Sequence, residues 1–235
     1  MNYKEHYRID ALEFDYWGDD QLSAAETRRN QTVFDLCGIK PGDKVLDIGS
    51  GRGWFSLKAA ELGAEVTALD LSEENLQKIK SINSKIITIY GDACDVPVSD
   101  EQFDLIVALE VLEHIVEPKT AVLNWKSLLK PGGKILVTVP YKEQIRYSLC
   151  IHCNQKTPVN AHLHSFDKEA LLRLFNHSGY WVKDTELFMH KLLATLRITP
   201  LIRKLPYQYW SFLDNLCGIF SKKYSFIAVT AVLKK

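Results

Sequence analysis

The sequence predicts an α/β fold built on a doubly wound, mostly parallel sheet. Short apolar runs alternate with helical patterns through the middle of the chain, which is typical of such sheets. The run at residues 103–109 is apolar almost throughout, as expected for a strand buried on both faces. A chain of 235 residues with 46% hydrophobic residues can bury one core without disulfides. We therefore expect one domain over residues 1–235.

The first part of the alternation surrounds a glycine-rich turn. In chain order, we expect a strand at residues 44–49, a helix at 55–62, a strand at 65–71 and a helix at 73–81. The first helix ends at Gly63. Ser72 is a suitable N-cap for the second helix, whose first turn is acidic and therefore complements the helix dipole.

The second part continues the same alternation. In chain order, we expect strands at residues 85–91 and 103–109, a helix at 120–129 and a strand at 134–139. A turn at residues 131–133, with one proline and two glycines, separates the last helix from the last strand, and Pro140 stops that strand.

The remaining segments lie outside this alternation. Residues 22–37 have a helical pattern, and Asp167 caps a helix that ends near Gly179. Two last strands, at 180–189 and 225–233, have no crossover pattern between them and could pair as an antiparallel hairpin at the sheet edge. We expect an N-terminal helical lid at residues 1–40, a core at 41–140, an irregular loop beside the ligand pocket at 141–166 and a helical insert at 185–224.

The glycine-rich turn, with glycines at 49, 51 and 53, follows a strand and opens a helix. Glycines there allow a ligand to approach the backbone and leave helix N–H groups free. A dinucleotide motif needs its third glycine at position 54, where this chain has Trp54. The chain also lacks a triphosphate-binding P-loop motif. The turn therefore fits a nucleoside without a pyrophosphate.

Two acids at strand ends extend this prediction. Asp70 follows Gly49 by 21 residues and can accept from both hydroxyls of a ribose; the alternative is a surface acid. Asp92 can accept from an exocyclic amine, and the small Ala93 leaves room for a flat base; the alternative is a simple turn.

At this point the chain resembles the class I S-adenosylmethionine-dependent methyltransferases, of the type 11-like group. The family's fold is a Rossmann-like, seven-stranded sheet whose last strand is antiparallel. The matching segments occur in the family's order and are VLDIGSGRGWFS (45–56), VTALDLS (66–72), GDACDVP (91–97), FDLIVALEVLEHI (103–115), LKPGGKILVTVP (129–140) and HSFDKEALLRLFNHSGYWV (164–182).

The resemblance implies a set of residues that bind S-adenosyl-L-methionine. Around the amino-acid end of this cofactor it places Asp47, Gly49, Ser50, Gly51 and Gly53. Asp70 would hold the ribose, and the adenine would lie between Leu71 and the pair Asp92 and Ala93. Leu109 and Glu110 would lie under the methionine part. Trp54 departs from the family, in which smaller residues are frequent.

The implied reaction is methyl transfer by in-line displacement, with S-adenosyl-L-homocysteine as the product. Alignment contributes more to this reaction than acid or base groups do, because the sulfonium already activates the methyl group. Candidate bases are His114, just past a strand end, and His162, which matches a recurrent histidine of related enzymes. The alternatives are a packed histidine and a solvated loop.

A second constellation could hold zinc. Cys150, Cys153, His162 and His164 form a C-x₂-C-x₈-H-x-H pattern, which offers four ligands for a tetrahedral site. Because the CxxC has no second CxxC as partner, we favour the alternative of incidental thiols. Zinc would compete with the base role of His162.

We expect a cytoplasmic methyltransferase that acts on the O, N or C atom of a small or medium-sized acceptor. Lys+Arg and Asp+Glu each number 29, and a net charge of zero disfavours nucleic acid as a partner. Residues 185–235 carry eight bases and two acids, a balance of about +6, together with several aromatic residues, which suggests an anionic or amphiphilic acceptor. No signal peptide or transmembrane segment is expected. Alternatives are an RNA- or protein-directed methyltransferase and a non-catalytic nucleotide-binding protein.

Overall fold

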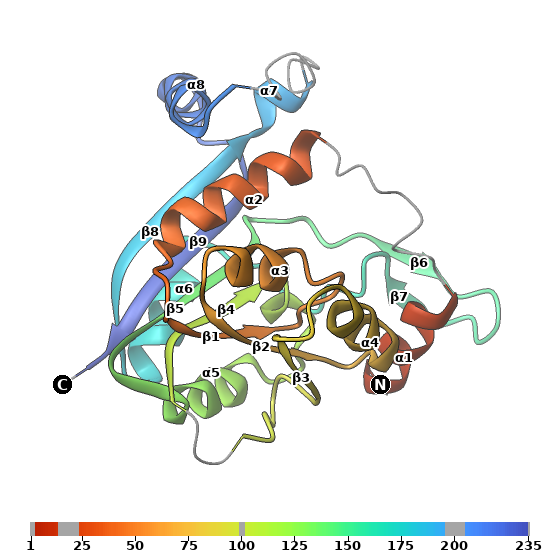
Figure 1. Cartoon of the computed structure of the whole chain (residues 1–235). Coiled ribbons are helices and arrows are strands. Elements are labelled where there is room, and N and C mark those ends of the chain that lie inside the picture. The colour runs from red at the N-terminus through yellow and green to blue at the C-terminus, as the bar shows by residue number, and fades with distance from the viewer. Residues whose placement is uncertain (1–2, 14–23, 99–101, 196–204, 235) are drawn as a thin grey trace.

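The computed structural model describes residues 3–13, 24–98, 102–195 and 205–234 (Figure 1). These residues form a central sheet with helices on both faces and a small hairpin that projects beside it. Much of the expected N-terminal lid and insert is described, but their parts at residues 14–23 and 196–204 lie outside these ranges.

The central sheet has seven strands in the order β3-β2-β1-β4-β5-β9-β8. Neighbouring strands from β3 to β5 are parallel, and β9 is antiparallel to both β5 and β8. The predicted doubly wound sheet with an antiparallel last strand is therefore confirmed. In chain order the strands are Lys44–Ile48, Glu65–Asp70, Ile87–Tyr90, Phe103–Leu109, Leu129–Pro140, Tyr180–His190 (β8) and Tyr224–Leu233 (β9).

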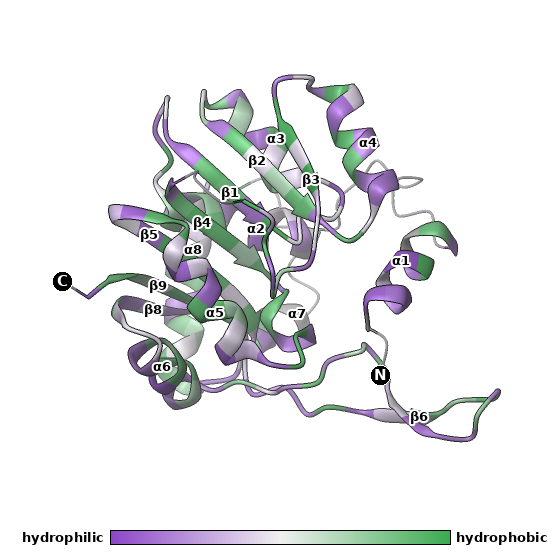
Figure 2. Ribbon diagram, turned by 90° about the horizontal axis from the view of Figure 1, so that it is seen from below, coloured by the Kyte–Doolittle hydropathy of each residue, from purple (hydrophilic) through white to green (hydrophobic). Residues whose placement is uncertain are grey.

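Helices cover both faces of this sheet. One face packs against α2 (Ala24–Cys37), α3 (Trp54–Glu61) and α4 (Glu73–Ile82), and its core includes Phe55 and Ile79. The opposite face packs against α5 (Pro118–Ser127) and α6 (Lys168–His177), where Trp125 is fully buried. The central strands are the greenest in Figure 2, since they are apolar on both faces.

Several predicted boundaries change in the structure. Strand β5 begins at Leu129 rather than at residue 134, because Phe103 pairs with Leu129 before the register shifts. The predicted turn at 131–133 is therefore an irregularity within a long strand. Strand β8 continues to His190, because it pairs with β9 along its length. The expected insert at 185–224 is thus shorter and contains α7 (Lys191–Thr195) and α8 (Tyr207–Phe220).

Three elements were not predicted. Helix α1 (Tyr3–Glu13) lies against α4, and the short 3₁₀ helix η1 (Leu112–His114) follows β4. The segment expected to be irregular contains a two-stranded hairpin of β6 (Tyr147–Leu149) and β7 (Lys156–Pro158), which projects from the body of the molecule (Figures 1 and 2). Such short, exposed strands carry little apolar periodicity, so sequence patterns do not reveal them.

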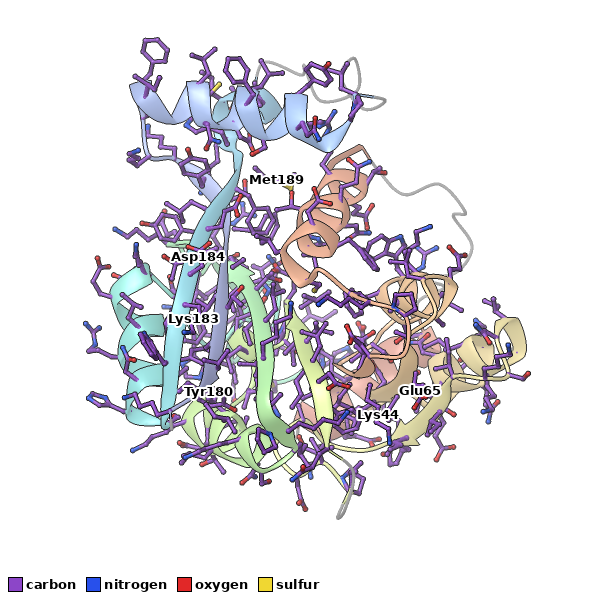
Figure 3. The ribbon with its side chains drawn as sticks, turned by 60° about the vertical axis from the view of Figure 1, so that its left-hand side comes forward. Lys44, Glu65, Tyr180, Lys183, Asp184 and Met189 are labelled. Atoms are coloured by element: carbon purple, nitrogen blue, oxygen red, sulfur yellow. The ribbon has the colours of Figure 1, made fainter. Side chains whose placement is uncertain are left out.

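The sheet has two distinct ends. Figure 3 shows Lys44, Glu65 and Tyr180 at the end where their strands begin, and Met189 at the opposite end of β8. The glycine-rich turn and both strand-end acids therefore lie at the carboxyl end, where doubly wound sheets bind ligands. Within the described residues, the helices are all too short or too polar to span a bilayer.

Candidate functional site

A cleft of about 300 Å³ opens at the carboxyl ends of four strands. Its walls come from Gly49 after β1, Asp70 at the end of β2, Asp92 after β3 and Glu110 after β4. Tyr7 of α1 covers one side. Because the ends of parallel strands meet at one edge of the sheet, residues up to 61 positions apart in sequence surround one space.

A second cavity of about 500 Å³ adjoins the first. Both cavities are lined by Gly49, Arg52 and Glu110, so the two spaces lie on either side of the glycine-rich turn. Arg29 of α2 and the end of β5 complete the second cavity.

The predicted cofactor residues are distributed between the two cavities. The first is lined by Gly49, Gly51, Asp70, Leu71, Asp92, Ala93 and Glu110. The second is lined by Asp47, Gly49, Ser50, Leu109 and Glu110. Gly53 lines neither cavity, and instead turns the chain against α4.

The glycine-rich turn requires glycine at two positions. Gly49 has a φ of 70°, and a Cβ there would lie 2.5 Å from Val111 Cγ2. Gly53 has a φ of 68°, and its Cβ would lie 2.3 Å from Ile79 Cγ1. Both positions are left-handed and crowded, so side chains would force the turn away from the cleft.

Asp70 ties the turn to the end of β2. Its Oδ2 accepts from the Gly51 N–H at 2.7 Å, and its Oδ1 accepts from the Ser72 N–H at 2.8 Å. Burial raises the pKa of this carboxyl, and the backbone hydrogen bonds oppose the shift. The Leu71 backbone also bonds this carboxylate, which keeps further acceptor capacity for a ligand.

Two other acids at the site have raised pKa values. Asp47 is 2% exposed and accepts a 2.6 Å hydrogen bond from the Ser56 hydroxyl, and burial raises its pKa to about 7. Burial also raises the pKa of Glu110 to about 7, although Arg29 and a 2.9 Å hydrogen bond from Thr138 favour its charged form. Glu110 has a φ of 57°, a strained conformation for a residue other than glycine.

Asp92 already has partners in this structure. Its Oδ1 accepts from the Cys94 N–H, and its Oδ2 forms a 2.7 Å ion pair with Lys4 of α1. The Ala93 carbonyl accepts from the Trp125 indole N–H at 2.7 Å, which fixes this loop to α5. A ligand amine at Asp92 would have to share the carboxylate with Lys4, a contact that sequence patterns did not reveal.

The two candidate bases lie together. The His114 and His162 rings meet edge to face with centroids 4.7 Å apart, and the Tyr7 hydroxyl bonds His114 Nδ1 at 2.6 Å. Burial lowers the pKa of His114 to about 4, so its ring is neutral near pH 7. His162 Nδ1 contacts the Glu143 carboxylate. His114 lines the cleft itself.

Glu113 is the residue of this region that the sequence reading missed. Its side chain is fully buried, and burial together with nearby Glu110 raises its pKa well above the usual value. Glu113 lies in η1, between Leu112 and His114. The available signal was a second acid next to the candidate base in the LEVLEHI segment.

The four candidate zinc ligands do not form one close group in the structure. Cys150 and Cys153 lie in the turn of the β6–β7 hairpin, whereas His164 Nε2 bonds the Ile115 carbonyl at 2.9 Å. Among the described residues, one group of three or more side chains that could bind a metal lies close together, and it includes neither of the two cysteines nor His164. The hairpin carries its cysteines away from the histidines, which the spacing could not show.

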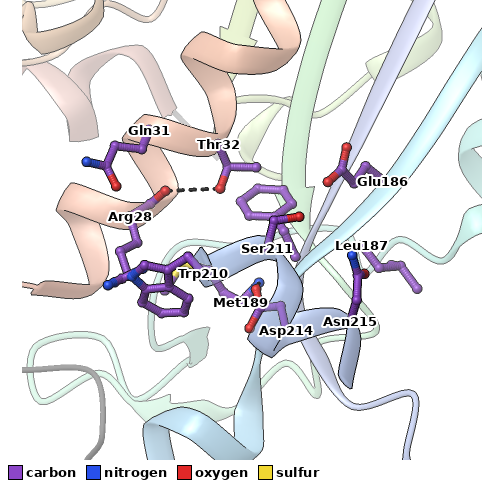
Figure 4. Close-up of a pocket in the computed structure, with 11 residues that line it drawn as sticks. Arg28, Gln31, Thr32, Glu186, Leu187, Met189, Trp210, Ser211, Asp214 and Asn215 are labelled. Carbon is purple, nitrogen blue, oxygen red and sulfur yellow. Dashed lines mark hydrogen bonds between the residues drawn. The ribbon is translucent and has the colours of Figure 1, made fainter. Parts of the chain in front are cut away.

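The two arginines of α2 point in different directions. Arg29 lines the second cavity, where it favours the charged form of Glu110. Arg28 instead lies over the Trp210 ring of α8, beside a space of only about 10 Å³ that Asp214 also lines (Figure 4). Burial lowers the pKa of Arg28 to about 9. This small space joins α2 to α8 and is too small for a ligand.

A seven-stranded sheet of this order, with a glycine turn and strand-end acids around one cleft, defines a nucleoside-binding α/β domain. A family model described as a methyltransferase domain matches residues 19–184, well over half of the chain. The chain therefore belongs to this family of methyltransferase domains.

Curated relatives match about half of the chain. Demethylmenaquinone methyltransferase of Renibacterium salmoninarum is 38% identical over 120 residues, which cover 51% of each protein. Ubiquinone biosynthesis O-methyltransferase of Xanthomonas campestris pv. campestris is 34% identical over 116 residues, which cover 47% of this chain and 48% of the relative. The chain thus spans about half the length of the curated relatives it matches.

Solved structures share the fold. Phosphoethanolamine N-methyltransferase 2 of Haemonchus contortus, in complex with S-adenosyl-L-methionine, has a TM-score of 0.70 at 18% identity and covers 100% of this chain and 60% of its own. An S-adenosylmethionine-dependent methyltransferase of Mesorhizobium loti has a TM-score of 0.64 at 17% identity and covers 89% and 99%. At these identities the likeness extends to the fold alone.

Proposed function

We propose that this protein binds S-adenosyl-L-methionine and transfers its methyl group to the O, N or C atom of a small or medium-sized acceptor. The observation that carries this proposal is the position of Asp70, whose carboxylate anchors the glycine-rich turn and lines the cleft. Membership of a methyltransferase-domain family supports the same reaction.

The residues present fit this cofactor. Asp70 has free lone pairs for the ribose hydroxyls, and Leu71 offers an apolar surface beside the space next to Ala93 for the adenine. The second cavity would take the amino-acid end: Asp47 and Glu110 attract its ammonium group, and Arg29 attracts its carboxylate. The buried Ser50 hydroxyl, which has no hydrogen-bond partner among the described residues, is available as a further donor there.

The chain's contribution to the reaction is alignment. The bound cofactor supplies an electrophilic methyl group on a sulfonium. The glycine-rich turn and Glu110 line the junction of the two cavities, and so they fix the direction from which the acceptor approaches the methyl group. Helix α1 places Tyr7 over the cleft and acts as part of a lid that excludes water. Orientation of this kind supplies about 7–11 kcal/mol in favourable cases.

His114 is the better placed base for an acceptor that must lose a proton. It lines the cleft, and its ring is neutral near pH 7. His162 contacts it and is held by Glu143, so it would orient the His114 ring or receive the proton. General base catalysis of this kind contributes about 10²–10⁴-fold.

The acceptor in this proposal is amphiphilic and related to quinones, as the names of the curated relatives suggest. Helix α8 supports this choice. Its outer face exposes Tyr209, Phe212, Ile219 and Phe220, with Ile219 75% and Phe220 80% exposed, and two exposed lysines follow it at 222–223. An apolar face flanked by cations suits contact with an anionic lipid surface, where such an acceptor would dissolve.

Two alternatives remain distinguishable. An RNA- or protein-directed methyltransferase is less consistent with a net charge of zero. A non-catalytic nucleotide-binding protein would bind the cofactor without turnover. We place the protein in the cytoplasm, where the cofactor is made and where five free cysteines stay reduced.

The test has two parts. Calorimetry with S-adenosyl-L-homocysteine should show one site per chain, and no heat of binding would refute the cofactor assignment. Labelled S-adenosyl-L-methionine should then transfer its methyl group to phenolic quinone precursors rather than to RNA or protein extracts. Binding without transfer to any of these pools would favour the non-catalytic alternative.

A further inference from the structure

Three metal-ligating side chains meet beside the cleft. Glu113 and His114 belong to η1, and His162 belongs to the loop between β7 and α6. One ligand atom from each of these three side chains lies within 4.8 Å of the other two. Within the ranges that the structure describes, no other group of three or more such side chains is this compact.

The Glu113 carboxylate is the observation that points to a ligand. It is fully buried, and both of its oxygens lack a hydrogen-bond partner among the described residues. A buried carboxylate without partners costs several kcal/mol unless something compensates it. A cation between Glu113 and the two histidines would provide that compensation.

The backbone holds the three residues in place. The Glu113 carbonyl accepts from the Leu163 N–H at 2.8 Å and from the His164 N–H at 3.2 Å. These bonds fix the loop that carries His162 against η1. The backbone therefore holds the three residues together without help from their side chains.

The Nδ1 atoms of both histidines already have partners. The Tyr7 hydroxyl bonds His114 Nδ1, and the Glu143 carboxylate contacts His162 Nδ1. The Nε2 atoms are therefore the ones available for a metal. His114 also bonds the Ala161 backbone, and a metal at Nε2 would replace that bond where both use the same nitrogen. A metal-bound histidine commonly bonds a carboxylate through its other nitrogen, as His162 does here.

We propose that Glu113, His114 and His162 bind one divalent cation of the zinc type. Two imidazole nitrogens and one carboxylate oxygen make the ligand set of zinc sites that keep an open position. Tetrahedral coordination with bonds of about 2.1 Å would separate the ligand atoms by about 3.4 Å. The ligand atoms of the three side chains lie within 4.8 Å of one another, close to this separation.

The cation would lie at the border of the cleft, because His114 lines it. Its open position could take an oxygen of the acceptor and lower the pKa of an acceptor hydroxyl. This consequence rests on the proposed function, whereas the binding of the cation does not. A bound cation would also occupy both candidate bases and so replace general base catalysis.

The test measures metal binding without cofactor or acceptor. The full chain, stripped of metal with a chelator, is titrated with Zn²⁺ by calorimetry and with Co²⁺ by visible absorption. We expect one equivalent to bind, with at least about 100-fold weaker binding in Glu113→Gln and His162→Gln, and about 10- to 100-fold weaker binding in Glu143→Gln. Circular dichroism and affinity for S-adenosyl-L-homocysteine show that each variant is folded.

Matched controls separate this site from the cysteine pattern. His164→Ala, two residues from His162, and the double variant Cys150→Ser/Cys153→Ser should bind Zn²⁺ as the unaltered chain does. Absence of Zn²⁺ binding to the unaltered chain would overturn the proposal. So would loss of binding in the cysteine variant together with its retention in Glu113→Gln. Absence of Zn²⁺ binding to an unaltered chain that still binds S-adenosyl-L-homocysteine would refute this inference alone and leave the proposed function intact.

Discussion

Replacement of Asp70 by alanine is the sharpest test of the cofactor site. The carboxylate accepts from the backbone N–H groups of Gly51 at 2.7 Å and Ser72 at 2.8 Å, and the Leu71 backbone bonds it as well. It retains acceptor capacity that the ribose hydroxyls can use. Asp70→Ala removes both ribose bonds and also releases the glycine-rich turn.

The expected loss follows from these contacts. A hydrogen bond to a charged group contributes about 1.5–3 kcal/mol, but the carboxyl is partly exposed, so both bonds together contribute about 1–3 kcal/mol. This range corresponds to about 5- to 150-fold weaker binding of S-adenosyl-L-homocysteine. Release of the turn adds to the loss, so the observed value should lie in the upper part of the range.

Calorimetry measures the affinity, and thermal unfolding checks that the variant is folded. The matched control is Glu65→Gln, an exposed acid at the opposite end of the same strand, which should leave the affinity unchanged. A folded Asp70→Ala protein that binds S-adenosyl-L-homocysteine within twofold of the unaltered chain would refute the ribose assignment.

Three further predictions concern stability. Gly53→Ala should lower the free energy of unfolding by about 2 kcal/mol or more, because of the φ of 68° at Gly53 and the clash with Ile79. The control Gly132→Ala, with open space around it, should lower it by only about 1 kcal/mol. Equal losses in denaturant titrations would contradict this prediction. Burial raises the pKa of Asp47 from 3.8 to about 7, so the fold favours its protonated form, and stability should decline as pH rises from about 4 to about 7, by up to about 1.4 kcal/mol per pH unit. Asp47→Asn should reduce that slope, while Glu110 and Glu113, whose pKa values burial also raises, keep a decline of the same sign; an unchanged slope would show that Asp47 does not contribute. Asp167→Ala should lose about 1 kcal/mol, because the carboxylate caps α6 through the Ala170 N–H at 2.8 Å, and Asp167→Asn should retain most of the stability in the same titrations.

The sequence by itself determined the sheet and the glycine-rich turn. Strands such as Phe103–Leu109 are buried on both faces, so their apolar character shows in the sequence without any knowledge of their neighbours. The cap at Ser72 was equally readable, and the structure shows its hydroxyl oxygen accepting from the Asn75 N–H. These features depend on contacts between residues close in the chain or on burial alone.

The tertiary structure decided which side chains meet. The cysteines of the β6–β7 hairpin and the histidines at 162 and 164 are close in sequence, yet the hairpin separates them. Glu113 and His162 are 49 residues apart, yet the loop before α6 packs on η1 and joins them. Long-range packing fixes such contacts, and no local pattern encodes it. The sequence therefore indicated the nucleoside cleft, whereas only the folded chain showed the cluster at its border.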